Sequence, residues 1–330
     1  MVPIAPSATT TRVARACRRV SIMIAESYRA LPDSLYNMSA PELKVIEVSD
    51  GAELTLRLWR TSSESEIPVL LLHGLSQQGQ FWAPVVNRMR SGTVAALDQR
   101  GHGRSDVPLN LEFTIPRCAL DVAEICTALG WDQVIVVGHS WGAWVAISAA
   151  AEYPDLVRAI ALIDGGLWGP ADLAESIGRE ATLEQLHPPQ LALTANELWQ
   201  MLESGPMATW WSDETRAALE PTFSPRAEGL FGSTIGLERH LRVLAGLLDY
   251  PVDFDLRTID CPIWTVLCES EGMELPKGAL ARVAATPSIR LQRWQGAVHD
   301  VPLQWPAMVA GLIDTVVETE QLAIQKGVSR

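Results

Sequence analysis

Lysine is scarce in this sequence, and long hydrophobic segments are missing from it. Only three of the 26 basic residues are lysine, and the 39 acidic residues leave a formal net charge of −13 at pH 7. A chain with this charge repels polyphosphate and anionic membrane surfaces, so nucleic acid is not an expected partner. No stretch approaches the roughly 18 consecutive apolar residues that a membrane span requires. We therefore expect no integral membrane span.

Paired cysteines are missing as well. The sequence has five cysteines, with no CxxC motif and no histidine at metal-ligand spacing. This usage is typical of free thiols in a reducing compartment, and it predicts a cytoplasmic protein without a metal or other cofactor. Near the N-terminus Glu26 interrupts an apolar run before it reaches the length of a signal-peptide core. We interpret residues 1–40 as an N-terminal arm or helix, and the sequence leaves open whether the chain forms a homodimer.

Alternating strand and helix patterns fill most of the remaining chain. Residues 43–48 and 54–59 alternate apolar with other side chains, as in an antiparallel hairpin. The later strands are continuous apolar runs, which is the pattern of strands buried on both faces. They cover residues 68–73, 93–98, 133–138, 158–164, 261–268 and 289–294. With helical periods between them, this order predicts an α/β fold with a mostly parallel, doubly wound sheet and an antiparallel N-terminal hairpin.

One segment interrupts the alternation. Residues 165–250 contain several Pro and Gly breaks and helical stretches but no clear buried strand. We interpret this segment as a helical cap inserted into one α/β core, which comprises residues 41–164 and 251–330.

Ser140 lies in VVGHSWGAW (136–144), where an apolar strand passes into an alanine-rich helix. Gly138 and Gly142 complete a G-x-S-x-G pattern, which needs small residues because a sharp strand-to-helix turn brings the backbone close to itself. The N-terminus of the following helix would stabilise negative charge near the serine oxygen. The pattern therefore indicates a nucleophile, with a simple helix N-cap serine as the alternative.

A nucleophilic serine needs a base, and the base needs an acid. Among the six histidines, His299 lies between the last predicted strand and the last helix, where a base is expected. His139, next to Ser140, is better explained by packing. Glu271, in the loop after the strand 261–268, is the favoured acid. Asp164, at the end of the strand 158–164, is the alternative.

The negative charge that develops during acyl transfer is usually stabilised by backbone N–H groups. His73-Gly74-Leu75 follows a buried strand and supplies a glycine turn at the same edge of the predicted sheet. We therefore expect the N–H groups of Leu75 and Trp141 to form the oxyanion hole.

Five motifs occur in a familiar order: LLLHGLSQQGQFW, LDQRGHGRSD, VVGHSWG, CESE and GAVHD. With them the chain resembles the α/β-hydrolase family, in particular its cap-bearing serine hydrolases of esterase, lactonase and C–C hydrolase type. The resemblance runs from about Pro41 to the C-terminal helix. It implies that Ser140 is the nucleophile, His299 the base and Glu271 the acid.

Two comparisons with the family pattern matter for the reaction. Relatives that open epoxides or remove halide usually carry aspartate at the nucleophile position, so Ser140 argues against those reactions. The family more often has aspartate where we place Glu271, and this keeps Asp164 as the alternative acid.

Aromatic and methionine side chains are frequent in the cap and the catalytic loops, as in sites that enclose bulky apolar ligands. The predicted substrate-binding residues are Phe81, Trp82, Trp168, Met207, Trp210 and Trp211. The leading prediction is a serine hydrolase that cleaves a carboxylic ester or lactone of a bulky hydrophobic small molecule through an acyl-enzyme. The same triad would also serve C–C bond, amide or thioester cleavage, acyl transfer or cyclisation. A hydrolase-like ligand receptor is the alternative outside enzymology.

Overall fold

The computed structural model describes residues 40–60, 67–90, 92–188, 192–250, 252–269 and 277–327. The predicted N-terminal arm lies outside this part of the chain, apart from Ala40. No helix of the described residues is long and apolar enough to cross a membrane.

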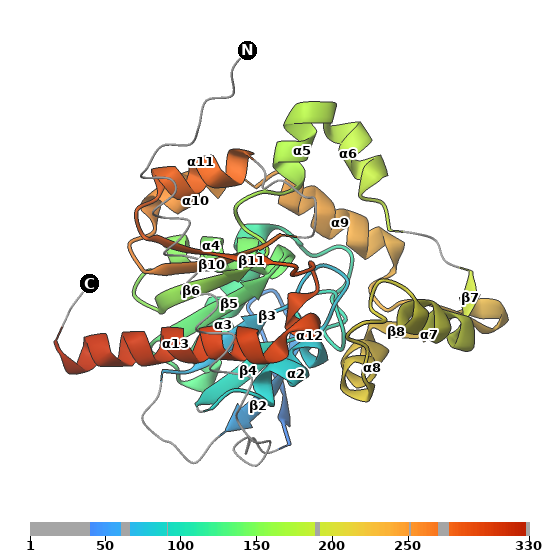
Figure 1. Ribbon diagram of the computed structural model, residues 1–330, viewed down its shortest axis with the longest axis horizontal. Coiled ribbons are helices and arrows are strands. Elements are labelled where there is room, and N and C mark those ends of the chain that lie inside the picture. Colours follow the sequence, from blue (N-terminus) through green and yellow to red (C-terminus); the bar gives the residue numbers. More distant parts are fainter. Residues whose placement is uncertain are drawn as a thin grey trace.

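An eight-stranded sheet forms the centre of the molecule (Figure 1). Its strands are β1 (Glu42–Glu47), β2 (Glu53–Arg60), β3 (Val69–Leu72), β4 (Thr93–Leu97), β5 (Val134–His139), β6 (Val157–Ile163), β10 (Ile263–Glu269) and β11 (Ile289–Gln295). They lie in the order β1-β2-β4-β3-β5-β6-β10-β11. β2 is antiparallel to both β1 and β4, and all other neighbours are parallel. The predicted mostly parallel sheet with an antiparallel N-terminal hairpin is confirmed.

The central strands are buried on both faces because helices cover each side. In β3, Leu70 and Leu72 pack in one hydrophobic cluster, while Val69 and Leu71 pack in the other. The first face carries α3 (Ile115–Leu129), α4 (Trp141–Glu152), α10 (Val252–Thr258) and α11 (Lys277–Ala285). The second carries α2 (Ala83–Val86), α12 (Val301–Gln304) and α13 (Pro306–Gln325). These continuous apolar runs therefore fold as interior strands of a covered parallel sheet.

The stretch from α5 to α9, which lies between β6 and β10 in the chain, is beside the central sheet, above and to the right in Figure 1. Its helices are α5 (Pro170–Ile177), α6 (Arg179–Gln185), α7 (Ala195–Ser204), α8 (Asp213–Leu219) and α9 (Gly236–Leu248). It also contains a small antiparallel sheet of β7 (Leu193–Thr194), β9 (Leu230–Ser233) and β8 (Phe223–Pro225). This sheet was not predicted from the sequence, because strands of two to four residues are too short to show a period of two.

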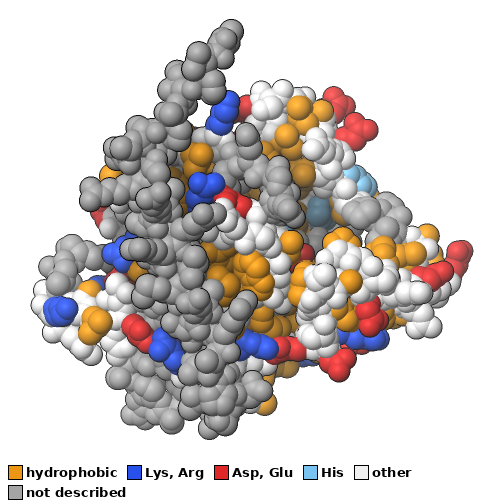
Figure 2. Space-filling view, viewed as in Figure 1, with side chains coloured by type: hydrophobic (Ala, Val, Ile, Leu, Met, Phe, Trp, Pro, Cys, Tyr) orange, Lys and Arg blue, Asp and Glu red, His pale blue; other side chains and the backbone are white. Residues whose placement is uncertain are grey.

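Basic side chains are scattered over the described part of the face shown in Figure 2. Its Lys and Arg side chains lie singly among other residue types. The described residues of this face therefore form no basic patch of the kind that binds nucleic acid.

Candidate active site

Ser140 lies in the sharp turn between β5 and α4, with backbone angles φ 51° and ψ −116°. Glycine on either side makes this turn sterically feasible. A Cβ atom at Gly138 would lie 2.2 Å from the carbonyl oxygen of Gly142, and one at Gly142 would lie 2.4 Å from that of Leu72. The G-x-S-x-G pattern thus reflects close backbone contacts, and a positive φ at a serine is a strain that functional turns commonly carry.

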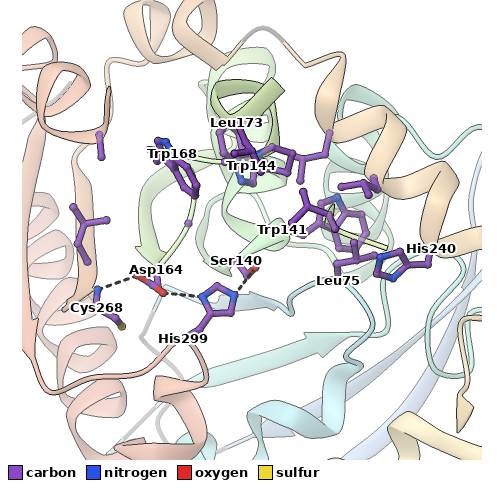
Figure 3. Close-up of a pocket in the computed structure, with 18 residues that line it drawn as sticks. Leu75, Ser140, Trp141, Trp144, Asp164, Trp168, Leu173, His240, Cys268 and His299 are labelled. Carbon is purple, nitrogen blue, oxygen red and sulfur yellow. Dashed lines mark hydrogen bonds and ion pairs between the residues drawn. The ribbon is translucent and has the colours of Figure 1, made fainter. Parts of the chain in front are cut away.

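Three side chains form a continuous chain of hydrogen bonds that ends at Ser140 (Figure 3). His299 Nε2 lies 2.9 Å from Ser140 Oγ, and His299 Nδ1 lies 2.7 Å from Asp164 Oδ2. The other carboxylate oxygen of Asp164 accepts a hydrogen bond of 2.9 Å from the backbone N–H of Cys268. Because the carboxylate can only accept, Nδ1 carries its proton toward Asp164, and Nε2 is left to accept the serine proton.

The residue beside His299 is Asp164 and not the favoured acid of the sequence analysis. Glu271 lies outside the described residues, and the position next to Nδ1 that it would need is occupied by Asp164. The nearby Glu269 forms an ion pair with Arg293. β6 and β10 are neighbours in the sheet, so a carboxylate after either strand would approach His299. Asp164 and Glu271 both precede His299 in the chain, so their order in the sequence does not identify the acid.

The surroundings of His299 favour its protonated form. Burial lowers the pKa of this imidazole, but the hydrogen bond and negative charge of Asp164, together with the charge of Asp300, more than offset that effect and raise it above the ordinary value. A raised pKa makes the neutral imidazole a stronger base toward the neighbouring hydroxyl of Ser140.

His139 packs against the loop that carries His299. Its ring stacks on Phe81 with 5.2 Å between centroids, and Nε2 lies 2.8 Å from the backbone carbonyl oxygen of His299. Burial lowers the pKa of His139 to about 3, so the ring is neutral and donates to that carbonyl. His139 therefore packs beneath the loop that carries His299 and does not face Ser140 Oγ as a base.

Leu75 and Trp141 lie on two backbone segments that meet at Ser140. The Leu75 segment is close because a Cβ atom at Gly74 would be 3.1 Å from Ser140 Cβ. Trp141 is the first residue of α4, so its N–H has no partner within the helix. Within the described ranges neither N–H donates to another atom, and both residues line the cavity beside Ser140.

A cavity of about 470 Å³ opens next to Ser140 and is bounded mainly by apolar side chains of α4, α5 and α9. Among the predicted substrate-binding residues, Trp168 lines it (Figure 3). Phe81 and Trp82 do not, because the short turn Gly79–Trp82 directs both rings into the core, where they are fully buried.

The three cap residues predicted with them are placed elsewhere too. Met207, Trp210 and Trp211 pack against the hydrophobic cluster on the opposite face of the sheet. Several residues of the cavity wall were not predicted from the sequence: Trp144, Leu173, Leu186, His240, Leu244 and Leu247. Trp144 follows Ser140 by one helical turn, and Leu244 and Leu247 share one face of α9, so helical spacing would have identified them.

Comparisons with known proteins agree with this fold. A family described as the alpha/beta hydrolase fold matches residues 67–223. The chain is 39% identical over 97 residues to 2-(acetamidomethylene)succinate hydrolase of Mesorhizobium japonicum, covering 29% of this chain and 34% of that relative. It is 26% identical over 221 residues to the putative carbamate hydrolase RutD of a Caulobacter species, covering 66% of this chain and 77% of that relative.

A solved structure of E-2-(acetamidomethylene)succinate hydrolase superposes with a TM-score of 0.68 at 24% identity, over 84% of this chain and 99% of that one. The match to the first curated relative spans only about a third of that relative's length. Sheet order, the geometry of the turn at Ser140 and these matches together show that the chain has the alpha/beta hydrolase fold.

Proposed function

We propose that this protein is a serine hydrolase that cleaves a carboxylic ester or lactone of a bulky, uncharged, hydrophobic small molecule. The observation that carries the proposal is the hydrogen-bonded series Asp164, His299 and Ser140, which ends at the mouth of an apolar cavity. A pure ligand receptor has no need of a base aligned on a serine hydroxyl.

The proposed reaction has two stages. Ser140 Oγ attacks the carbonyl carbon while His299 Nε2 takes its proton, and the resulting oxyanion accepts hydrogen bonds from the N–H groups of Leu75 and Trp141. His299 then gives the proton to the leaving alkoxide, and the acyl group stays on Ser140. Water attacks this ester with His299 again as the base, and the acid is released. Asp164 holds the imidazole orientation and stabilises its protonated form.

The chemistry of the cavity wall supports an uncharged substrate. Its described lining includes Trp141, Trp144 and Trp168 and no lysine or arginine. Asp164 is the carboxylate of the described lining, and it is already hydrogen-bonded to His299 and to the N–H of Cys268. The succinate in the relative's name contains carboxylates, and the described lining offers no lysine or arginine to pair with them. We therefore expect this chain to differ from that relative in substrate.

The inserted segment fits the role of a cap. α5 and α9 supply one side of the cavity, while α4 and the loops after β3 and β6 supply the other. We assign residues 165–250 as the cap, with residues 41–164 and 251–330 as the core. The cytoplasmic location and the homodimer stay predictions.

Kinetics of Ser140→Ala test the proposal. On a series of p-nitrophenyl esters and uncharged lactones, we expect this variant to lose at least about 1,000-fold in kcat. Ser148→Ala is a matched control, because Ser148 is buried on the same helix and bonds to Glu152. Turnover by Ser140→Ala at the wild-type rate would contradict the proposal, and so would equal losses in both variants.

A further inference from the structure

Ser76 holds a constrained position directly after the proposed oxyanion donor Leu75. Its φ is 69°, in the left-handed region that favours glycine. Two hydrogen bonds fix it there: its N–H donates to His102 Nε2 at 3.2 Å, and its Oγ lies 2.8 Å from His240 Nδ1. A non-glycine residue persists in this conformation only when its surroundings determine it. The orientation of the Leu75–Ser76 peptide therefore depends on these two histidines.

His102 links both proposed oxyanion donors. Its Nδ1 lies 3.0 Å from the carbonyl oxygen of Arg100, so Nδ1 carries the proton and Nε2 accepts from Ser76 N–H. Its ring stacks on Trp141 with centroids 5.0 Å apart and 27° between planes. His102 therefore contacts both Ser76, which follows the first proposed donor, and Trp141, which is the second.

His240 connects this loop to the cap. It lies on α9, whose Leu244 and Leu247 line the cavity together with His240 itself (Figure 3). Its ring also interacts with the backbone of Leu186. Ser76 Oγ and His240 Nδ1 share one hydrogen bond of 2.8 Å. One imidazole therefore joins the wall of the acyl cavity to the oxyanion loop.

The pair is not a second catalytic dyad. Ser76 does not line the cavity, and no carboxylate of the described residues is bonded to His240. Without a charged partner the imidazole lacks the group that makes His299 a strong base.

We propose that His240 and Ser76 are positioning residues through which cap helix α9 fixes the Leu75 N–H in the oxyanion hole. A substrate that fills the cavity presses on Leu244 and Leu247 and so sets the position of α9. The oxyanion donor is then best aligned when the acyl group fits. This inference rests on the proposed function, because it assigns a catalytic use to Leu75.

The test compares His240→Leu, His240→Gln and the matched control His187→Leu, an exposed cap histidine bonded to the Pro188 carbonyl. We expect His240→Leu to lower kcat on a p-nitrophenyl ester by about 10- to 100-fold with KM changed less than about three-fold, a loss below that of removing an oxyanion donor outright. His240→Gln keeps a hydrogen-bonding group and should recover most of the rate. His187→Leu should match wild type.

Ser76→Gly separates positioning from folding. Glycine tolerates φ 69°, so thermal stability should be kept or raised, while kcat should fall as in His240→Leu because the hydroxyl is lost. Combining Ser76→Gly with His240→Leu should add little to either loss. A kcat within about two-fold of wild type in Ser76→Gly or His240→Leu would overturn the inference, as would fully additive losses.

A second readout keeps this inference apart from the proposed function. The rate at which an uncharged fluorophosphonate labels Ser140 also depends on the oxyanion hole, and it does not require a good substrate. We expect labelling to slow in His240→Leu and Ser76→Gly but not in His187→Leu. Normal labelling in the first two would refute the positioning role alone, whereas no labelling of the wild type would refute the proposed function.

Discussion

Among single residues, Asp164 is where the structure differs most from the sequence prediction, which favoured Glu271 as the acid. It follows β6 with φ 47°, another positive value at a non-glycine residue, and its carboxylate is held by His299 and by the N–H of Cys268. Ser140 and Asp164 thus both occupy backbone conformations that proteins commonly retain at functional positions. Each lies at the carboxyl end of a parallel strand, where an open α/β sheet gathers its site.

Replacing the acid tests which carboxylate orients His299. We expect Asp164→Asn to lower kcat by about 10³- to 10⁴-fold, because an amide neither fixes the tautomer nor stabilises the imidazolium. Glu271→Gln should keep kcat within about two-fold. Steady-state kinetics of the two variants on one ester decide between the acids, and the reverse ranking would restore Glu271.

The titration of His299 predicts the pH dependence. The neutral imidazole is the base, so activity is lost as the pH falls through its pKa, which Asp164 and Asp300 raise above the ordinary value of about 6.5 despite burial. A profile of kcat/KM from pH 5 to 9 should fall on the acid side with a midpoint above about 6.5. A flat profile down to pH 5.5 would contradict this assignment.

At the scale of elements, the junction of β5 and α4 depends on backbone contacts that admit no side chain. Leu72 at the end of β3 lies so close to α4 that a Cβ atom at Gly142 would overlap its carbonyl oxygen. Apolar strand patterns and the glycine spacing identify this junction from sequence, since both are local signals.

Gly142→Ala tests the junction. The added methyl must displace backbone, so we expect a loss of about 1–3 kcal/mol in the free energy of unfolding together with reduced activity. Gly278→Ala in α11 is the control, since its nearest contact would be an ordinary 3.4 Å. Urea denaturation measures the free energy of unfolding of both variants. Equal stability of the two would show that the junction of β5 and α4 is not sterically constrained.

Elements that depend on distant contacts were less predictable. The choice of acid required knowing that β6 and β10 are neighbours. Phe81 and Trp82 lie in the segment after β3, and the turn that contains them directs both rings into the core. No local sequence pattern predicts that side-chain direction.

At the scale of the whole molecule, the proposed function depends on α4, α5 and α9 meeting at one cavity. Trp168 and Trp211 both lie between β6 and β10, but Trp168 lines the cavity whereas Trp211 packs beside Trp199, with 6.4 Å between ring centroids. Composition alone does not separate the aromatic side chains that line the cavity from those that pack against other residues of the same segment, and only the three-dimensional arrangement does.

These two tryptophans provide a matched pair. We expect Trp168→Ala to raise KM for a bulky aromatic ester by about ten-fold, equivalent to roughly 1.4 kcal/mol of lost binding, with a smaller effect on an acetate ester. Trp211→Ala should leave the ratio of the two KM values unchanged. A change in that ratio for Trp211→Ala alone would place the substrate in a different part of the cap.

The most direct test of the account is the intact mass of the protein during turnover. Rapid acid quenching of the enzyme with a slowly released uncharged ester should show one added acyl mass, and peptide mapping should place it on Ser140. Ser140→Ala should show none. An acyl group on another residue, or ester hydrolysis by Ser140→Ala at the wild-type rate, would contradict the central claim that Ser140 is the nucleophile.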